Sequence, residues 1–168
     1  TAVGVGIVLA SLAFVKEAAE VQVESIRLVE SEHAELFNPQ EAELFRRCQK
    51  RALVLHLSGL MSFGAANEMA RKFKSLGSHD VLIIDLLDVP RVDTSAGLAL
   101  EGLISRALNA DQEVILVGLN YSVARLLGRL GSLDLVKETH RFSTRIEGLN
   151  AAVEMVMAKM TMPVQVPV

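Results

Sequence analysis

Tryptophan is absent from this sequence of 168 residues, and other aromatic side chains are few: one tyrosine and six phenylalanines. The 17 Lys and Arg are outnumbered by 20 Asp and Glu, which leaves a net charge of −3. Proteins that bind nucleic acid generally present a basic surface or a set of stacking aromatic rings. The composition therefore argues against a nucleic-acid partner.

Cysteine is also scarce. Cys48 stands alone, so the chain forms no internal disulfide, and one Cys with four scattered His does not make a standard structural zinc site. We therefore predict an intracellular protein that holds no metal and no cofactor. A chain of 168 residues has the length of one domain and can bury roughly 70% of its unfolded surface.

Charge is missing altogether from the opening stretch, Thr1–Val15. Its small residues Ala2, Gly6 and Ala10 recur at every fourth position, a pattern that lets membrane helices approach closely. Fifteen apolar residues fall short of the ~20 that cross a bilayer, and the chain starts with Thr rather than Met. We predict that residues 1–15 are the C-terminal end of a transmembrane helix that begins upstream.

Two other interpretations of this apolar stretch remain open. A signal peptide would need a positive leader and a cleavage site, but Lys16 and Glu17 follow instead. The plainer alternative is a buried first helix or strand of a soluble domain.

Acidic residues dominate the next segment. Residues 17–43 hold eight of them against the single base Arg27, and we predict an acidic linker over residues 16–50. Within it we expect a first strand, formed by Val21, Val23, Ile26 and Leu28, and a connector helix that begins at Asn38-Pro39 with Glu41 in its first turn. The bases near its end are Arg46, Arg47, Lys50 and Arg51. They match the helix dipole at a solvated end, or alternatively contact anionic lipid headgroups.

Strand-length apolar runs alternate with helix-spaced apolar residues after Arg51. The runs occupy residues 52–57, 81–87 and 114–119, and helical spacing recurs over 66–76, 100–108, 123–130 and 146–160. Because parallel neighbours need a crossover, the alternation predicts an α/β fold, with a mainly parallel mixed sheet of about four or five strands and a similar number of helices. We expect the folded core over residues 51–160 and an extended tail over 161–168. His56 is expected to be a hydrogen-bonded residue of the sheet.

Helix boundaries are marked by glycine and by capping residues. Gly77 and Gly131 stand where helices should end. Thr144 and Glu147 form a capping box for the last helix, and Asn120 or Ser122 can cap the helix before it.

Polar residues that could bind a ligand or take part in a reaction gather in one turn, residues 85–97, which follows the most apolar predicted strand. The candidate site residues there are Asp85, Asp88, Asp93, Thr94, Ser95 and Gly97. Ligands of α/β folds bind outside the carboxyl ends of the strands, where this turn is expected to lie. Asp93, Thr94 and Ser95 can each cap the next helix, whose free N–H groups favour a negative group.

The residues of this turn agree better with some kinds of functional site than with others. Three carboxylates could hold a metal, although nothing in the sequence brings them together. Ser95 lacks the G-x-S-x-G elbow of a nucleophile, and the turn lacks the G-x-x-x-x-G-K-[ST] phosphate loop. A recognition surface with phosphorylatable hydroxyls remains, and a plain capped helix start explains the residues equally well. No enzymatic activity is predicted.

Three segments in a specific order carry a family resemblance. They are Leu57-Ser58-Gly59-Leu60 with Phe63; Ile84-Asp85 through Val89-Pro90 to Asp93-Thr94-Ser95; and residues 114–118 followed by Leu126-Leu127 and Gly131-Ser132-Leu133. From about Arg51 to Met155 the chain resembles the STAS domain, which SulP-type anion transporters share with bacterial anti-sigma-factor antagonists. The resemblance implies the STAS fold.

In the antagonists, the second hydroxyl residue of this turn accepts a phosphate from a kinase. The resemblance implies the same role for the matching residue of this chain. That position is Ser95 here, with Thr94 as the neighbouring candidate. The turn departs from the D-[ST]-S-G pattern because Ala96 stands in place of the glycine, which follows as Gly97. Asp85, Asp88, Asp93 and Gly97 are then expected to form a partner surface or an anion-binding turn.

The apolar start and the acidic linker resemble the arrangement of a SulP transporter. The resemblance implies a non-catalytic domain on the cytoplasmic side of the inner membrane, which assists folding, pairing and regulation of a bicarbonate or sulfate carrier. Residues 59–66 are most similar to bacterial members such as cyanobacterial bicarbonate carriers. Expected partners are its own transmembrane domain, a second copy, the membrane through the N-terminal segment, and a regulatory protein or kinase. The alternatives are a soluble antagonist-like regulator and, more weakly, a nucleotide-binding module.

Overall fold

A mixed sheet forms the centre of the computed structural model, which describes residues 25–32, 35–72 and 79–161. In that part of the chain the sheet has five strands in the order β1-β2-β3-β4-β5. They are β1 (Ser25–Val29), β2 (Ala52–Ser58), β3 (Val81–Asp88), β4 (Glu113–Val117) and β5 (Arg141–Phe142). β1 runs antiparallel to β2, and all other neighbours are parallel. The predicted α/β fold is confirmed.

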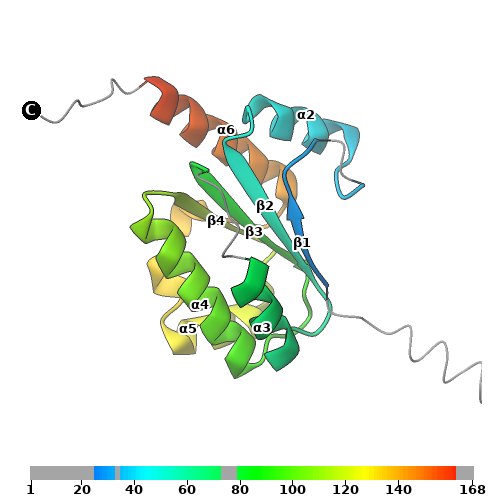
Figure 1. Cartoon of the computed structure of the whole chain (residues 1–168), viewed down its shortest axis with the longest axis vertical. Coiled ribbons are helices and arrows are strands. Elements are labelled where there is room, and N and C mark those ends of the chain that lie inside the picture. Colours follow the sequence, from blue (N-terminus) through cyan, green and yellow to red (C-terminus); the bar gives the residue numbers. More distant parts are fainter. Residues whose placement is uncertain (1–24, 33–34, 73–78, 162–168) are drawn as a thin grey trace, which may run out of the picture.

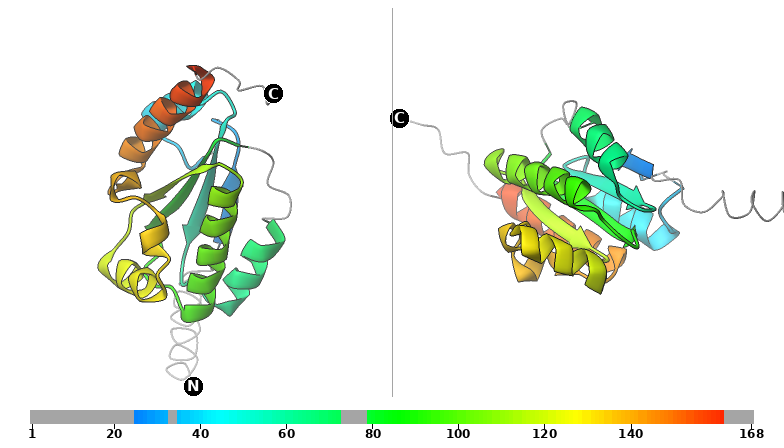
Figure 2. Two further views of the ribbon diagram at one scale, coloured as in Figure 1. Left: turned by 90° about the vertical axis from the view of Figure 1, so that its left-hand side faces the viewer. Right: turned by 90° about the horizontal axis from the view of Figure 1, so that it is seen from below.

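Helices cover both faces of this sheet (Figure 1). α2 (Pro39–Arg47) and α6 (Arg145–Thr161) lie on one face, and α3 (Phe63–Lys72), α4 (Thr94–Asn109) and α5 (Tyr121–Leu130) lie on the other. The left view of Figure 2 shows the strands between α6 on one side and α3 and α4 on the other. The short 3-10 turns η2 (Leu133–Leu135) and η3 (Glu138–His140) lead into β5.

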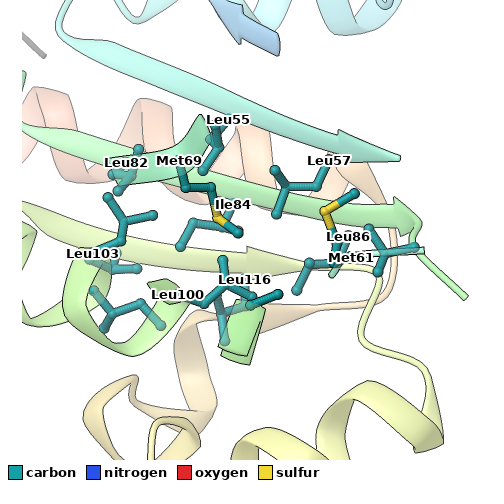
Figure 3. Close-up of a cluster of buried hydrophobic side chains, with 14 of the residues drawn as sticks. Leu55, Leu57, Met61, Met69, Leu82, Ile84, Leu86, Leu100, Leu103 and Leu116 are labelled. Carbon is teal, nitrogen blue, oxygen red and sulfur yellow. The ribbon is translucent and has the colours of Figure 1, made fainter. Parts of the chain in front are cut away.

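Two apolar clusters explain why the central strands are apolar at almost every position. On β3, Leu82, Ile84 and Leu86 point toward α3, α4 and α5, whereas Val81 and Ile83 point toward α2 and α6. Alternate side chains of a strand face opposite sides, so a strand covered on both faces needs apolar residues throughout. Figure 3 shows the first cluster, in which side chains of β2, β3 and β4 meet those of α3 and α4.

The segment expected to be a linker contributes to this core. β1 is an edge strand that includes Ile26 and Leu28, as predicted, while Val21 and Val23 lie outside the described residues. α2 was expected to be a connector, but it packs on α6 and buries Leu44 and Phe45, together with Cys48 directly after its end. The reason is its amphipathic sequence, which presents one apolar stripe to the sheet. Burial raises the pKa of the Cys48 thiol to about 11, against an opposing effect of Arg47.

Most predicted helix boundaries are confirmed. Asn38 and Glu41 form a full capping box at α2, Asn120 caps α5, and Thr144 pairs with Glu147 at α6. Gly131 ends α5 in the left-handed conformation with φ of 78°. Gly77, the apolar segment 1–15 and the tail after Thr161 lie outside the described residues. Among the described helices, none has the length and apolar character needed to cross a bilayer.

Candidate functional site

Three loops at the carboxyl end of the parallel strands are bound to one another. The N–H of Gly59 donates to the carbonyl of Asp88 (2.9 Å), and the N–H of Met61 donates to the carbonyl of Arg91 (3.0 Å). The Nδ2 of Asn120 donates to the carbonyl of Val89 (2.8 Å). The loops after β2, β3 and β4 therefore form one continuous surface.

A hollow of about 420 Å³ lies on this surface. Its lining consists of Ser58, Gly59, Leu87, Asp88, Val89, Pro90 and Asn120. Asp88 is the only charged residue in that lining, and its side chain is 61% exposed. The hollow thus combines apolar groups of Leu87, Val89 and Pro90 with polar groups, among them one accessible carboxylate.

The predicted D-T-S turn borders this surface. Asp93 caps α4, because its Oδ1 accepts the N–H of Ala96 at 2.8 Å. Thr94 is exposed and Ser95 is half-buried, and they are the first two residues of the helix. The capping role is confirmed for Asp93. A phosphate on Ser95 or Thr94 stays a prediction.

Gly97 is buried beneath α5 rather than lying on the surface of the turn. A Cβ atom added at Gly97 would lie 2.6 Å from Cδ1 of Leu130, so the absence of a side chain lets α4 and α5 approach closely. Ala96, which replaces the glycine of the family pattern, is fully buried in the apolar cluster. Both positions therefore serve helix packing.

Replacing Asp93 by Ala is expected to lower the free energy of unfolding by about 1 kcal/mol, since the N–H of Ala96 loses its acceptor. Urea unfolding followed by circular dichroism measures the change. Asp93→Asn is the matched control, because an asparagine side chain caps a helix about as well. Equal losses in the two variants would contradict the capping role.

Asp85 does not belong to the exposed turn. It is fully buried and points toward α2 and α6, because it shares a strand face with Val81 and Ile83. Its Oδ2 lies 2.9 Å from Nδ1 of His56 and 2.9 Å from Nε of Arg145. Burial alone would raise the pKa of Asp85, but the hydrogen bond with His56 and the charge of Arg145 outweigh it and lower the pKa.

Arg145, at the start of α6, extends this interaction to α2. Its Nη1 donates to Oε2 of Glu41 at 3.2 Å and to the carbonyl of Leu36 at 3.3 Å. Burial opposes the charged form of Arg145, yet Asp85 and Glu41 raise its pKa. The four side chains His56, Asp85, Arg145 and Glu41, here called the buried ionic network, join β2, β3, α2 and α6.

His56 connects the buried ionic network to the hollow. Its Nδ1 faces Asp85, and its Nε2 lies 3.5 Å from Oδ2 of Asp88. The prediction that His56 is a hydrogen-bonded sheet residue is confirmed. In the described part of the chain, no group of three or more His, Cys, Asp or Glu side chains is arranged to hold a metal ion.

Sequence reasoning missed Arg145 and Glu41 as members of this network. A signal for part of it was present, because a carboxylate inside the apolar run of residues 81–87 must find a partner when it is buried. The identity of the partner was not readable, since Arg145 lies 60 residues further along the chain.

The chain is similar to proteins of one family over most of its length. A sequence profile of the STAS domain matches residues 46–148. "Bicarbonate transporter BicA" of Picosynechococcus sp. is 31% identical over 153 residues, and the protein of the same name from Synechocystis sp. is 29% identical. Each match covers 90% of this chain but only 27% of the relative. The chain thus spans about a quarter of the length of these curated relatives.

Solved structures give a consistent result. A SulP transporter STAS domain from Vibrio cholerae is 28% identical, with a TM-score of 0.55 over 64% of this chain and 84% of its own. A sulfate transporter family protein from Wolinella succinogenes (20% identical, TM-score 0.59) covers 63% of this chain and 88% of its own. The structure of SLC26A9 (16% identical, TM-score 0.52) covers 95% of this chain and 28% of its own. The last two support the fold alone.

Proposed function

The chain belongs to the STAS domain family, and from this membership we propose that it is the cytoplasmic domain of a SulP-type anion transporter, acting in folding, pairing and regulation. The similarity to two bicarbonate transporters over 90% of the chain carries the proposal. Bicarbonate is therefore the favoured ion, and sulfate is the alternative.

The proposal includes the parts outside the described residues. Residues 1–15 end the last membrane helix on the cytoplasmic side of the inner membrane, and the acidic residues that follow form the tether. The charge-free composition of the first segment and the acidic composition of the second support this arrangement. The tether is shorter than residues 16–50, since β1 already begins at Ser25.

The proposed role is structural and regulatory rather than catalytic. In the buried ionic network, Asp85 has partners in β2 and α6, and Arg145 has partners in β3 and α2, so these groups hold the fold together. The hydroxyls of Thr94 and Ser95 lie at the start of a helix, where a phosphate would find free N–H groups. This placement supports control of the domain by modification or by a partner.

Deleting residues 46–161 from the full-length protein is expected to abolish most uptake of labelled bicarbonate, because the membrane part loses its assembly domain. Uptake is measured in a bacterial host that lacks its own carriers, and pairing is measured by chemical crosslinking in membranes. Gly102→Ala is the control, since an added Cβ at Gly102 meets nothing within 4 Å. Unchanged uptake and pairing after the deletion would contradict the proposal.

A soluble partner-switching regulator is the second candidate, favoured by the exposed Thr94 and half-buried Ser95 at the start of α4. Such a regulator would capture a kinase-like protein until phosphate is added. Fractionation separates the two candidates: a full-length product in the soluble fraction with phosphate on Ser95 supports the regulator.

A further inference from the structure

Exposed apolar side chains gather at one end of the domain. Of the nine large ones in the described residues, five lie at the carboxyl ends of the parallel strands or in the first five residues of the helices that follow: Leu60, Phe63, Leu87, Leu98 and Tyr121. Phe63 is 66% exposed and Tyr121 is 80% exposed. Large apolar side chains that stay exposed at the same end of a domain mark a candidate interaction site. We call these five residues the carboxyl-end patch.

The chain enters the domain at this same end. Ser25, the first residue of β1, pairs with Ser58, the last residue of β2, because the two strands are antiparallel (Figure 1). The residues between Val15 and Ser25 can span at most about 35 Å when fully extended. The opposite end of β2 lies farther away by the length of the strand, about 20 Å. If residues 1–15 end in the membrane, the carboxyl-end patch is the near side of the domain.

The surface around the patch fits a protein better than a bilayer. The adjoining hollow is concave, with Asp88 as its only charged lining residue, and Asp93 is exposed nearby. Anionic headgroups would be repelled by these carboxylates. Cytoplasmic loops of membrane proteins are rich in Lys and Arg, which complement an acidic hollow. Arg91 is exposed outside the lining, and Arg125 lies over the ring of Tyr121 at 5.9 Å.

From these observations we propose that the carboxyl-end patch and the Asp88 hollow dock onto basic cytoplasmic loops of the transporter's own membrane domain. The inference rests on the proposed function and adds the surface that makes the contact. It also assigns an orientation to the bases at the end of α2. They precede the start of β2, so they face away from the membrane rather than contacting lipid headgroups.

Photo-crosslinking in the full-length protein tests the proposal. Benzoylphenylalanine replaces Phe63 or Tyr121 in the patch. As matched controls it replaces Leu108 or Met157, which are also exposed but lie toward the other end of the domain. After irradiation of native membrane vesicles, mass spectrometry maps the products. The patch positions are expected to give about tenfold more crosslinks to membrane-domain loops than the control positions, the ratio that corresponds to ~1.4 kcal/mol.

Charge reversal provides an independent measurement. Asp88→Lys is expected to reduce the crosslinks from position 63 about tenfold, since like charges then meet in the hollow, whereas Asp88→Glu retains them. Since the Asp88 side chain is mostly exposed, both variants are expected to fold, and circular dichroism checks this.

If the full-length protein transports anions, four results would overturn the inference but leave the proposed function intact. They are crosslinks from the patch to lipid, to the STAS domain of a second copy or to a separate soluble protein, and equal yields at patch and control positions. A product found only in the soluble fraction would instead overturn the proposed function, and this inference with it.

Discussion

Replacing Asp85 by Ala is expected to lower the free energy of unfolding by about 3 to 5 kcal/mol, the usual cost of removing one member of a buried ion pair. Arg145 would keep a largely buried charge with Glu41 as its remaining carboxylate partner, and Nδ1 of His56 would lose its partner. Urea unfolding of the 168-residue chain measures the change.

Asp88→Ala is the matched control for this substitution. Asp88 is the second carboxylate near His56, but its side chain is mostly exposed and lies farther away, so we expect a loss below about 1 kcal/mol. Similar losses in both variants would contradict the special role of the buried carboxylate.

The same carboxylate predicts how stability depends on pH. The folded-state pKa of Asp85 lies below its unfolded value of about 3.9, so its contribution to stability is complete above that value and is lost as pH falls toward the folded pKa. Asp85→Asn removes the titrating group and should flatten the stability curve on the acidic side of about pH 4. Parallel curves for the two proteins would show that other groups govern acid unfolding.

The second large effect is expected from Gly118→Ala. Gly118 has φ of 75°, and an added Cβ would lie 2.7 Å from the Cα and backbone N of Leu87. The left-handed conformation costs a residue with a side chain about 1 to 2 kcal/mol, and forced overpacking adds about 1 to 3 kcal/mol. We therefore expect thermal and urea unfolding to report a loss of about 2 to 5 kcal/mol.

Gly131→Ala separates these two contributions. Its φ of 78° is nearly the same, but an added Cβ meets nothing within 4 Å. This variant should lose only the conformational part, about 1 to 2 kcal/mol. If both glycine variants lose the same stability, the backbone of Leu87 moves away without cost, and the close approach of Gly118 to β3 does not contribute to stability.

The sheet and its helices were predictable because their signals are local. The apolar run of β3 reflects cover on both faces, and the caps Asn38, Asp93 and Asn120 each lie next to the helix that they begin. A cap acts within three residues, so sequence alone contains the whole interaction. The same holds for the placement of the D-T-S turn at the end of β3.

The unpredicted features depend on contacts between distant segments. The pleat of β3 turns Asp85 inward, and only the fold brings it to Arg145. Gly97 is required for packing because α5 crosses at that point. Met160 has the helical spacing of a core residue, yet it is 47% exposed because the last turn of α6 extends beyond the cluster that buries Val156.

Arg145 has a further consequence during biosynthesis. The ribosome makes Glu41, His56 and Asp85 well before it reaches this guanidinium, which begins the last described helix. Until α6 emerges, the nascent chain holds the Asp85 carboxylate without its guanidinium partner, beside an apolar sheet face that α2 covers only in part. Closure of the domain is thus coupled to synthesis of its final helix, and products that stop before α6 should be recognised by chaperones and proteases as incomplete.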